Sequence, residues 1–477
     1  MGKRTTTPSF IHEFPLRVSI HEAHQIEKRL EKARQVYNAA LNECFRRIER
    51  MKHSTEYRAI EDMKPKTRMV KGADGKPKRE FTPEYKAARQ ALLLKYGFSE
   101  YSLNGWAKSL TGTWVTEGLN GQVFRAVVRR AFMTAAKFYF GKGGKPKFKS
   151  KRTPLESIEN STNLQGLVWR DGYLLWNKND LKLKAVVDMG EPRDRYALSC
   201  RVKYPRLVRK DLNGKARYFV QLVLEGWPYP EPEKRTAPSG SVVGFDLGPS
   251  KVAIVTDTEA RYEPLLPELR PAEKALRRLD RRMDRQRRAS NPDNYHADGT
   301  VKRGKRKWKK SRRYLVTQAK RADVYRKLAA QRKTLQGEFT NGLLRAGETI
   351  KAEKLNYVAW QRNRHFGRRV QRNAPGMMLS LLRRKAGKRL YDIDVFKTRL
   401  SQFCVCGRYQ KKPLSQRQHE CECGAKVQRD VFSAYGARFV DETTGRLDAA
   451  KLLADWPDAE PRLQTASSGK GTGKSGA

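Results

Sequence analysis

The stretch GFDLGPSKVAIV, residues 244–255, is the part of the sequence that decides the fold of the C-terminal half. It reads as a buried strand that carries an acid, Asp246, followed by a Gly-Pro-Ser turn and a second apolar strand. A carboxylate beside an apolar strand is desolvated unless it binds a cation. Because strand-Asp-x-Gly is also a common turn or capping pattern, Asp246 alone is weak evidence for a metal site.

Two further acids stand in similar surroundings. Glu353 lies in IKAEKLNYVAW, residues 350–360, at the start of a predicted buried strand or of a turn that leads into a helix. Asp430 lies in VQRDVFSAYGARFV, residues 427–440, where helical spacing predicts a helix that begins near this acid. Taken alone, Asp430 reads as an N-cap or first-turn acid, and any Glu can occupy position 353. Three acids from separated segments, however, form the ligand set with which two Mg²⁺ ions promote phosphodiester cleavage.

A cluster of cysteines lies between the second and the third acid. The sequence has Cys-Val-Cys-Gly at residues 404–407 and Cys-Glu-Cys-Gly at residues 421–424, and we expect a short basic hairpin that contains His419 between the two pairs. Four thiolates suit tetrahedral Zn²⁺ in a structural role, and the candidate ligands are Cys404, Cys406, Cys421 and Cys423. The C-x-C spacing is one residue shorter than the usual C-x-x-C, which admits His419 as a substitute ligand and leaves unliganded cysteines as the alternative.

The charge of the chain predicts a polyanionic partner. Its 477 residues include 101 Lys and Arg against 50 Asp and Glu, for a formal net charge of +51. Clustered Lys and Arg bind phosphates by releasing counterions, so we expect a long nucleic acid. Two stretches stand out, GKGGKPKFKSKR at residues 141–152 and VKRGKRKWKKSRR at residues 301–313, each with a central aromatic residue. The candidate contacts are Lys145, Lys147, Lys149, Lys305, Arg306, Lys307, Trp308, Lys309 and Lys310. A solvated linker or loop is the alternative for both stretches.

Changes in hydrophobic periodicity along the chain predict several domains. No apolar run is long enough to span a membrane and no signal-peptide pattern is present, so we expect a soluble, intracellular protein. Apolar residues at helical spacing from 26 to 48 predict one long helix, residues 64–78 are a predicted loop, and helical patterns then resume. Strands follow, with a predicted hairpin around Asp171-Gly172 and a predicted strand after the turn pair Asn213-Gly214. The predicted parts are a β-rich domain (1–20 and 155–235), a helical lobe (21–154), an α/β domain (236–403 and 424–460) with a basic helical insertion (about 271–349), the ribbon (404–423) and a flexible tail (461–477).

The order of these features resembles a known family. A strand with Asp246, then Glu353, then a cysteine ribbon, then Asp430 resembles the RuvC-like nucleases of the TnpB and compact type V CRISPR effector (Cas12-type) group. The resemblance is strong over residues 241–440, and GKPKFKS and NGKARYFVQLVLEG extend it loosely into the N-terminal half. The matching strings are GFDLGPSKVAIV, EKLNYVAWQRNRHFGRRVQRNAPGMMLSLLRRKA, FCVCGRYQKKPLSQRQHECECG and VQRDVFSAYGA.

The resemblance implies a fold and an activity. The fold would be bilobed, with an N-terminal β-barrel wedge domain that carries a helical recognition lobe and a C-terminal RNase H-like (RuvC) domain with an inserted zinc ribbon. Asp246, Glu353 and Asp430 would hold two Mg²⁺ ions, or Mn²⁺ in their place. The protein would bind a guide RNA, recognise a short flanking motif and cleave double-stranded DNA at one RuvC site, as a transposon-associated or CRISPR effector nuclease. It would act in the prokaryotic cytoplasm, at the nucleoid when bound to target.

One departure from the family keeps other functions open. Many members carry Asn two residues after the third acid, where this chain has Phe432. Because all three acids are present, the sequence favours an active nuclease. The alternatives are a guide-dependent DNA-binding protein without cleavage and a non-guided RNA-binding zinc protein. Whether two copies of the chain share one RNA also stays open.

Overall fold

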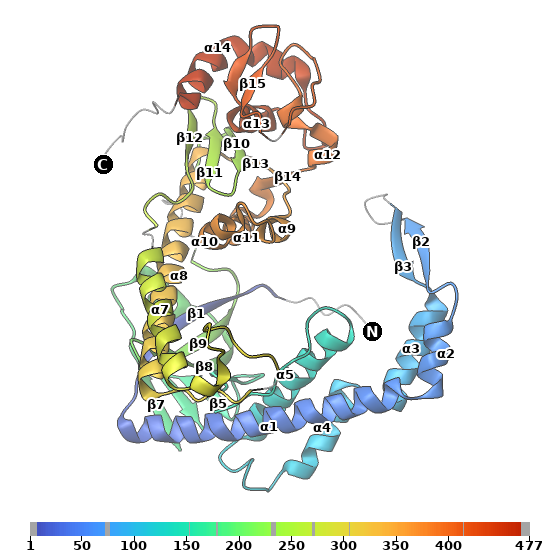
Figure 1. Ribbon diagram of the computed structural model, residues 1–477, viewed down its shortest axis with the longest axis vertical. Coiled ribbons are helices and arrows are strands. Elements are labelled where there is room, and N and C mark those ends of the chain that lie inside the picture. The colour runs from blue at the N-terminus through green and yellow to red at the C-terminus, as the bar shows by residue number, and fades with distance from the viewer. Residues whose placement is uncertain are drawn as a thin grey trace. The chain divides into compact units, whose positions relative to one another are not determined.

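The computed structural model describes residues 7–71, 77–151, 153–177, 180–229, 235–269, 272–304, 306–413 and 415–468. The chain divides into two compact units, Met1–Pro230 and Glu231–Ala477, and each is considered by itself (Figure 1). None of the helices in the described part of the chain is both long enough and apolar enough to span a bilayer.

The first unit contains a group of helices after its first strand. They are α1 (Ile20–Lys52), α2 (Thr55–Asp62), α3 (Pro83–Lys95), α4 (Glu100–Ala107) and α5 (Gly121–Tyr139). The helix expected around residues 26–48 is confirmed as α1, which begins at a capping box of Ser19 and Glu22 and packs on α5. The loop expected at residues 64–78 is wrong, because β2 (Thr67–Lys71) and β3 (Pro77–Phe81) pair there. Cross-strand partners such as Arg68 and Glu80 favour this pairing.

The rest of the first unit is a seven-stranded antiparallel sheet in the order β4-β8-β9-β1-β7-β6-β5. Turns with positive φ at Asp171-Gly172 and Asn213-Gly214 confirm the two hairpins expected there. The strands are β1 (Ser9–Arg17), β4 (Ser157–Glu159), β5 (Leu167–Arg170), β6 (Tyr173–Trp176), β7 (Leu181–Ala185), β8 (Val202–Leu212) and β9 (Lys215–Glu225), with α6 (Pro192–Ser199) between β7 and β8.

The sheet curls toward the barrel that was expected, without a closing ladder in the described strands. Its edge strand β5 contacts β8 near the other edge. Asn160, just after β4, donates to the carbonyl of Leu167 at 2.9 Å, and Asn163 accepts the amide of Trp169 at 2.7 Å. Two asparagine side chains therefore satisfy backbone groups that a further strand pairing would otherwise satisfy.

The second unit is built on a five-stranded sheet in the order β12-β11-β10-β13-β14. The first three strands pair antiparallel, whereas β13 and β14 run parallel to β10. The strands are β10 (Val242–Leu247), β11 (Lys251–Val255), β12 (Ala260–Pro264), β13 (Thr349–Glu353) and β14 (Leu390–Ile393). The strand-turn-strand reading of residues 244–255 is confirmed by β10 and β11.

Helices cover both faces of this sheet. Helices α8 and α11 share one apolar core with it, and α13 and α14 share the core of the other face. The helices are α7 (Glu273–Ala289), α8 (Arg312–Ala346), α9 (Tyr357–Gln361), α10 (Gly367–Asn373), α11 (Pro375–Ala386), α12 (Val395–Thr398), α13 (Arg429–Arg438) and α14 (Ala449–Ser467). Single 3₁₀ turns occur at Lys108–Leu110, Pro292–Asn294, Gly387–Arg389 and Leu400–Gln402.

Glu353 ends β13, because the β-forming residues Thr349, Ile350 and Ala352 precede it, and the residues after it lead into α9; this confirms the second of the two readings given for it. Two other expectations for this unit need correction. The flexible tail does not begin at residue 461, since α14 continues to Ser467 and buries Leu463; residues 469–477 lie outside the described residues. The hairpin expected between the two cysteine pairs is also displaced, because β15 (Gln418–Glu420) pairs with β16 (Lys426–Gln428), beyond the second pair.

Candidate active site and metal centres

Two of the three acids extend from neighbouring parallel strands. In the ladder of β10 and β13, Gly244 lies opposite Lys351 and Phe245 opposite Ala352. Asp246 and Glu353 come one residue later on each strand. Because side chains alternate along a strand, both acids lie on the face opposite to Phe245 and Ala352, which belong to the core under α8 and α11.

The third acid reaches the same face from α13. Asp430 lies in the first turn of this helix, as expected from the sequence, and α13 packs directly over β10 and β11. The closest approach is at Gly244, where an added Cβ atom would lie 1.8 Å from the carbonyl oxygen of Ala434. Only glycine allows a helix backbone to lie this close to the strand.

The electrostatics of the three acids reflect their proximity. Burial, followed by the charges of Glu353 and Asp430, raises the pKa of Asp246 well above its usual range. Burial and the charge of Asp430 raise the pKa of Glu353 to about 7. Carboxylates that raise one another's pKa in this way are a pattern typical of a functional site, and a divalent cation between them would relieve the repulsion.

Three polar residues around the acids were not predicted from the sequence. The hydroxyl of Tyr262 on β12 donates to Asp430 at 3.2 Å. The Gln428 side chain lies 3.3 Å from the same Oδ2, and its oxygen accepts the Asp430 amide at 2.6 Å as the N-cap of α13. Tyr357 on α9 donates at 3.2 Å to the carbonyl of Leu247, next to Asp246. Of these three residues, only the N-cap residue Gln428 could have been found from the neighbouring sequence, since a helix was predicted to begin there. Nothing in the sequence around a tyrosine indicates which group its hydroxyl contacts.

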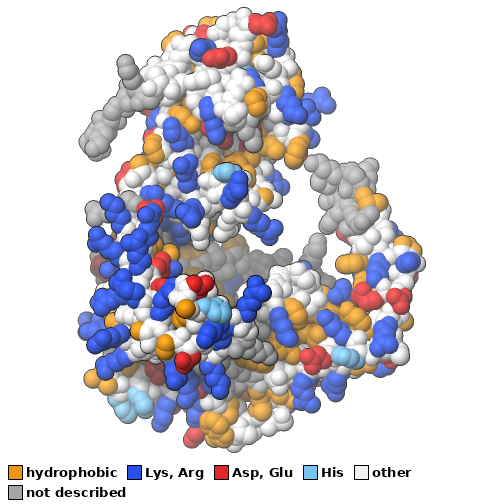
Figure 2. All heavy atoms as spheres, in the orientation of Figure 1, with side chains coloured by type: hydrophobic (Ala, Val, Ile, Leu, Met, Phe, Trp, Pro, Cys, Tyr) orange, Lys and Arg blue, Asp and Glu red, His pale blue; other side chains and the backbone are white. Residues whose placement is uncertain are grey.

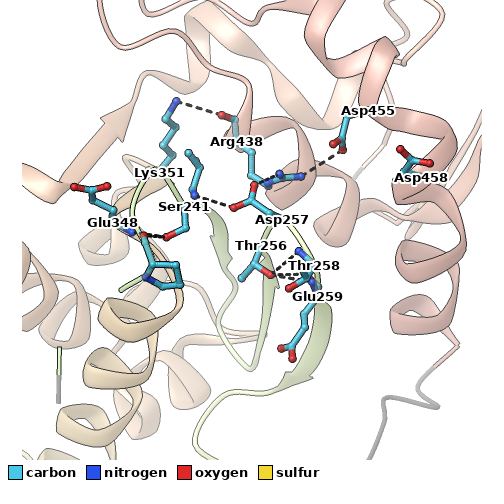
Figure 3. A network of polar contacts seen from close by, with 12 residues as sticks. Ser241, Thr256, Asp257, Thr258, Glu259, Glu348, Lys351, Arg438, Asp455 and Asp458 are labelled. Carbon is cyan, nitrogen blue, oxygen red and sulfur yellow. Dashed lines mark hydrogen bonds and ion pairs between the residues drawn. The ribbon is translucent and has the colours of Figure 1, made fainter. Parts of the chain in front are cut away.

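The opposite end of α13 is fixed by a buried charge network (Figure 3). Arg438 pairs with Asp257, which follows β11, and with Asp455 of α14 at 3.4 Å. Lys351 donates to the carbonyl oxygens of Arg438 at 3.2 Å and Val440 at 2.7 Å. The C-terminal end of α13 is therefore tied to β11, β13 and α14 by contacts that do not involve Asp246, Glu353 or Asp430.

The four predicted cysteines come together. The Sγ atoms of Cys404 and Cys423 lie 3.6 Å apart, as do those of Cys406 and Cys421, and all four lie within 4.8 Å of one another. A tetrahedral zinc ion with bonds of about 2.3 Å would separate its sulfurs by about 3.8 Å, so the cluster fits structural zinc despite the C-x-C spacing. Among the described residues, this is the one group of three or more ligand side chains whose ligand atoms lie close enough together to hold a metal ion, and the three acids do not form such a group.

The suggestion that His419 replaces a cysteine is wrong. His419 is fully buried and its ring stacks on Phe432, with 3.8 Å between ring centroids and 12° between planes. Its Nδ1 lies 2.6 Å from the Lys412 ammonium group, which donates to it. Four sulfurs already complete a tetrahedral set, so the histidine is available for packing.

The first predicted nucleic-acid stretch lies along α1. Asn38 accepts the Lys149 amide at 2.8 Å and donates to its carbonyl at 2.7 Å, which holds the segment against the helix. Lys145 and Lys147 are exposed, and Phe148 is 50% exposed with its ring 5.9 Å from Phe45. The cationic groups therefore face solvent while the backbone is held in place.

The second stretch lies in the second unit, between α7 and α8. Lys307, Lys309 and Lys310 are exposed and Arg306 is half-buried; Lys305 lies outside the described residues. Trp308 is 39% exposed, and Arg287 stacks over its ring at 5.3 Å, so this indole is already partly packed. Figure 2 shows Lys and Arg side chains gathered over α7 and α8. In α7 no residue is buried.

Comparison with known proteins bears on the resemblance that the motifs indicated. A protein of Streptomyces pristinaespiralis named "Putative RNA-guided DNA endonuclease" is 26% identical over 352 residues, which cover 72% of this chain and 76% of the relative. The chain is similar to this protein. The resemblance to RNA-guided nucleases that the motifs indicated is thereby confirmed, although no protein-family model matches the chain.

Two solved structures show a more distant likeness. A chain of the cryo-EM structure of the Cas12f1-sgRNA-target DNA complex is 11% identical, with a TM-score of 0.39, over 90% of this chain and 98% of that one. A chain of the CRISPR-Cas12f ternary complex is 13% identical, with a TM-score of 0.28, over 88% and 82%. These scores are too low to assign the fold, which rests on the strand order given above.

Proposed function

We propose that this protein is an RNA-guided DNA endonuclease that hydrolyses phosphodiester bonds at a single carboxylate centre. The observation that carries the proposal is the convergence of Asp246, Glu353 and Asp430 from β10, β13 and α13 on one face of a sheet. The strand order, three antiparallel strands followed by two parallel ones on the other side of β10, is that of the RNase H-like fold implied by the motifs. The similarity to a protein named as an RNA-guided DNA endonuclease supports the same assignment.

The three carboxylates would hold two Mg²⁺ ions, which supply an activated water and stabilise the leaving oxygen. Asp246 and Glu353 offer oxygens from adjacent strands, and Asp430 offers them from the helix. Tyr262 and Gln428 orient Asp430 by contacting the same carboxylate oxygen. The centre thus has rigid elements behind each ligand and hydrogen bonds that set the direction of one of them.

The remaining features fit binding of a guide RNA and target DNA. The surplus of positive charge suits the many phosphates of an RNA and an RNA-DNA heteroduplex, with sequence read by base pairing. The domain roles expected from the motifs, a wedge and a helical lobe in the first unit and a nuclease in the second, are part of this proposal. The cysteine cluster would hold zinc as a structural ion.

The proposal is tested by cleavage of plasmid DNA with the purified protein and its guide RNA. We expect Mg²⁺-dependent cleavage of a guide-matched target and none of a mismatched one. Retention of matched DNA without product would favour the alternative of binding without cleavage. Binding of RNA without any guide-dependent DNA recognition would favour the non-guided alternative.

Substituting Tyr262 with Phe should weaken metal binding at the carboxylates. The variant keeps the ring that Lys251 contacts at 4.5 Å, and it loses the hydrogen bond to Asp430 together with the one that the hydroxyl accepts from the Gln428 side chain at 3.0 Å. Loss of an orienting hydrogen bond of this kind weakens metal affinity by about tenfold or more. The half-saturating Mg²⁺ concentration for cleavage should rise accordingly. An unchanged value would show that Asp430 does not need this contact.

Metal affinity should depend on pH with a definite sign. Because the pKa of Glu353 is about 7, an incoming metal must displace a proton below that pH and meets a carboxylate above it. Mn²⁺ affinity of the full chain should rise from pH 6 to pH 7, by up to about tenfold per unit for each proton displaced, and the raised pKa of Asp246 acts in the same direction. The pKa of Glu353 is higher in the folded protein than the value of 4.5 in the unfolded chain, so protonation of Glu353 favours the metal-free folded state. This contribution to stability is complete below pH 4.5 and is lost as the pH rises through about 7. A Mn²⁺ affinity that is flat with pH would contradict the assignment.

Replacing Arg306, Lys307, Lys309 and Lys310 with Gln should weaken RNA binding. If all four contact phosphates of a single strand, the slope of log affinity against log salt should become less steep by up to about 3. Replacing Lys86, Lys95, Lys426 and Lys451, which each pair with a carboxylate, removes the same charge and serves as the control. Equal effects of the two sets would mean that the stretch acts only through net charge.

A further inference from the structure

We propose that the cysteine ribbon positions Asp430 through the stack of His419 on Phe432, so that zinc at the cysteines and the divalent metal at the carboxylates bind cooperatively. This inference rests on the proposed function of the acids as metal ligands. It assigns to the ribbon a task beyond its own folding, namely to fix the end of α13 that carries the third carboxylate.

The chain runs from the cysteine cluster to Asp430 without a flexible link. Cys421 donates its amide to the carbonyl of Ala425 at 3.1 Å, and β16 follows at once, paired with β15. The last residue of β16 is Gln428, which is also the N-cap of α13 and a neighbour of the Asp430 carboxylate. The Arg429 amide donates to the carbonyl of Arg417 at 2.8 Å, at the other end of the ribbon hairpin. A shift of the hairpin therefore shifts the first turn of α13.

The stack of His419 on Phe432 joins the ribbon to the interior of the nuclease unit. Phe432, two residues after Asp430, is 1% exposed and also packs edge-on against Trp456 of α14, with 6.0 Å between centroids. Cys404 belongs to the same apolar cluster as Phe432. The residue at which this chain departs from the family motif thus serves as the ribbon's packing partner.

The two ends of α13 have different anchors. Its C-terminal end is held by Arg438 and Lys351 and its middle by the contact at Gly244. Its N-terminal turn follows β15 and β16, a two-stranded sheet of three residues each, which would be marginal alone and which α14 supports on one side, where Ser467 accepts the Gln428 amide at 2.9 Å. Zinc at the four thiolates supplies further support. Loss of zinc should thus loosen Asp430 while the rest of the helix stays in place.

The test measures Mn²⁺ binding to the full chain by electron paramagnetic resonance, without nucleic acid. Because thermodynamic coupling is reciprocal, zinc-loaded protein should bind Mn²⁺ at least about fivefold more tightly than zinc-free protein, and Mn²⁺ should slow zinc release to a chelator. The variant His419→Ser should keep one zinc per chain and yet lose the Mn²⁺ affinity gained from zinc. His419→Phe should retain it, since it also loses the Lys412 contact but keeps a ring on Phe432.

The outcomes separate the two proposals. Equal Mn²⁺ affinity in zinc-loaded protein, zinc-free protein and His419→Ser would overturn the coupling while leaving the carboxylate site intact. Equal losses in His419→Ser and His419→Phe would overturn the role of the stack. Absence of Mn²⁺ binding in the zinc-loaded wild type, or binding that Asp246→Asn does not weaken, would overturn the proposed metal site itself.

Discussion

Replacing Asp246 with Asn should reduce cleavage of guide-matched DNA by a factor on the order of 10³ or more. The charges of both other acids act on Asp246, and its strand is at the centre of the sheet. Asn keeps the shape of the side chain but removes the charge that divalent metals require. Binding of guide RNA, which depends on the basic surfaces, should be unchanged. The measurement is the single-turnover cleavage rate together with RNA affinity.

Asp458→Asn is the matched control for this variant. Asp458 is exposed on α14 of the same unit, and Arg462 donates a hydrogen bond to its backbone carbonyl, which the substitution keeps. Its replacement changes the net charge by the same amount without touching the site. If the Asp246→Asn variant cleaved DNA as fast as the Asp458→Asn variant, the three carboxylates would not form the active site.

Replacing Gly244 with Ala should have the second largest effect, on both stability and cleavage. The added Cβ atom would lie 1.8 Å from the Ala434 carbonyl oxygen, a backbone atom that moves only if α13 moves. Overpacking of this kind costs about 1–3 kcal/mol or more in the free energy of unfolding. Because Asp430 is carried by α13, we also expect a loss of cleavage of at least about 10²-fold from misplaced ligands.

Gly342→Ala provides the comparison for this prediction. Gly342 lies in α8, where an added Cβ atom meets no atom within 4 Å. Alanine there should leave cleavage unchanged and raise the unfolding free energy by up to about 1 kcal/mol, because alanine favours the helix. Thermal unfolding and cleavage rates measured on both variants check the pair. Equal unfolding temperatures and rates would contradict the close contact of α13 with β10.

Much of the local structure followed from short-range patterns. The strands around Asp246 and the long helix α1 were visible because hydrophobic periodicity is set by which face is buried. The cysteine cluster was visible because four thiolates within twenty residues have few other uses in such a protein. Asp430 was placed at a helix start by the spacing that follows it.

Other features of the site depend on contacts between residues that lie far apart in the sequence, and local sequence patterns do not indicate such contacts. The sequence left open whether Glu353 starts a strand or a turn that leads into a helix, because the apolar residues on either side of it give equal signals, and only the parallel ladder with β10 decides between the two. The hydrogen bond from Tyr262 to Asp430 joins residues 168 positions apart. His419 was considered as a metal ligand because the C-x-C spacing is one residue short, and its stacking on Phe432, which lies on another element, leaves no trace in that spacing.

Sequencing the RNA that co-purifies with the protein after a high-salt wash tests whether a bound RNA directs the chain to DNA. We expect one discrete RNA with a constant part and a variable part, the constant part deriving from a CRISPR repeat or a transposon end. Recovery of bulk ribosomal RNA alone would contradict guided recognition and favour a non-guided RNA-binding zinc protein.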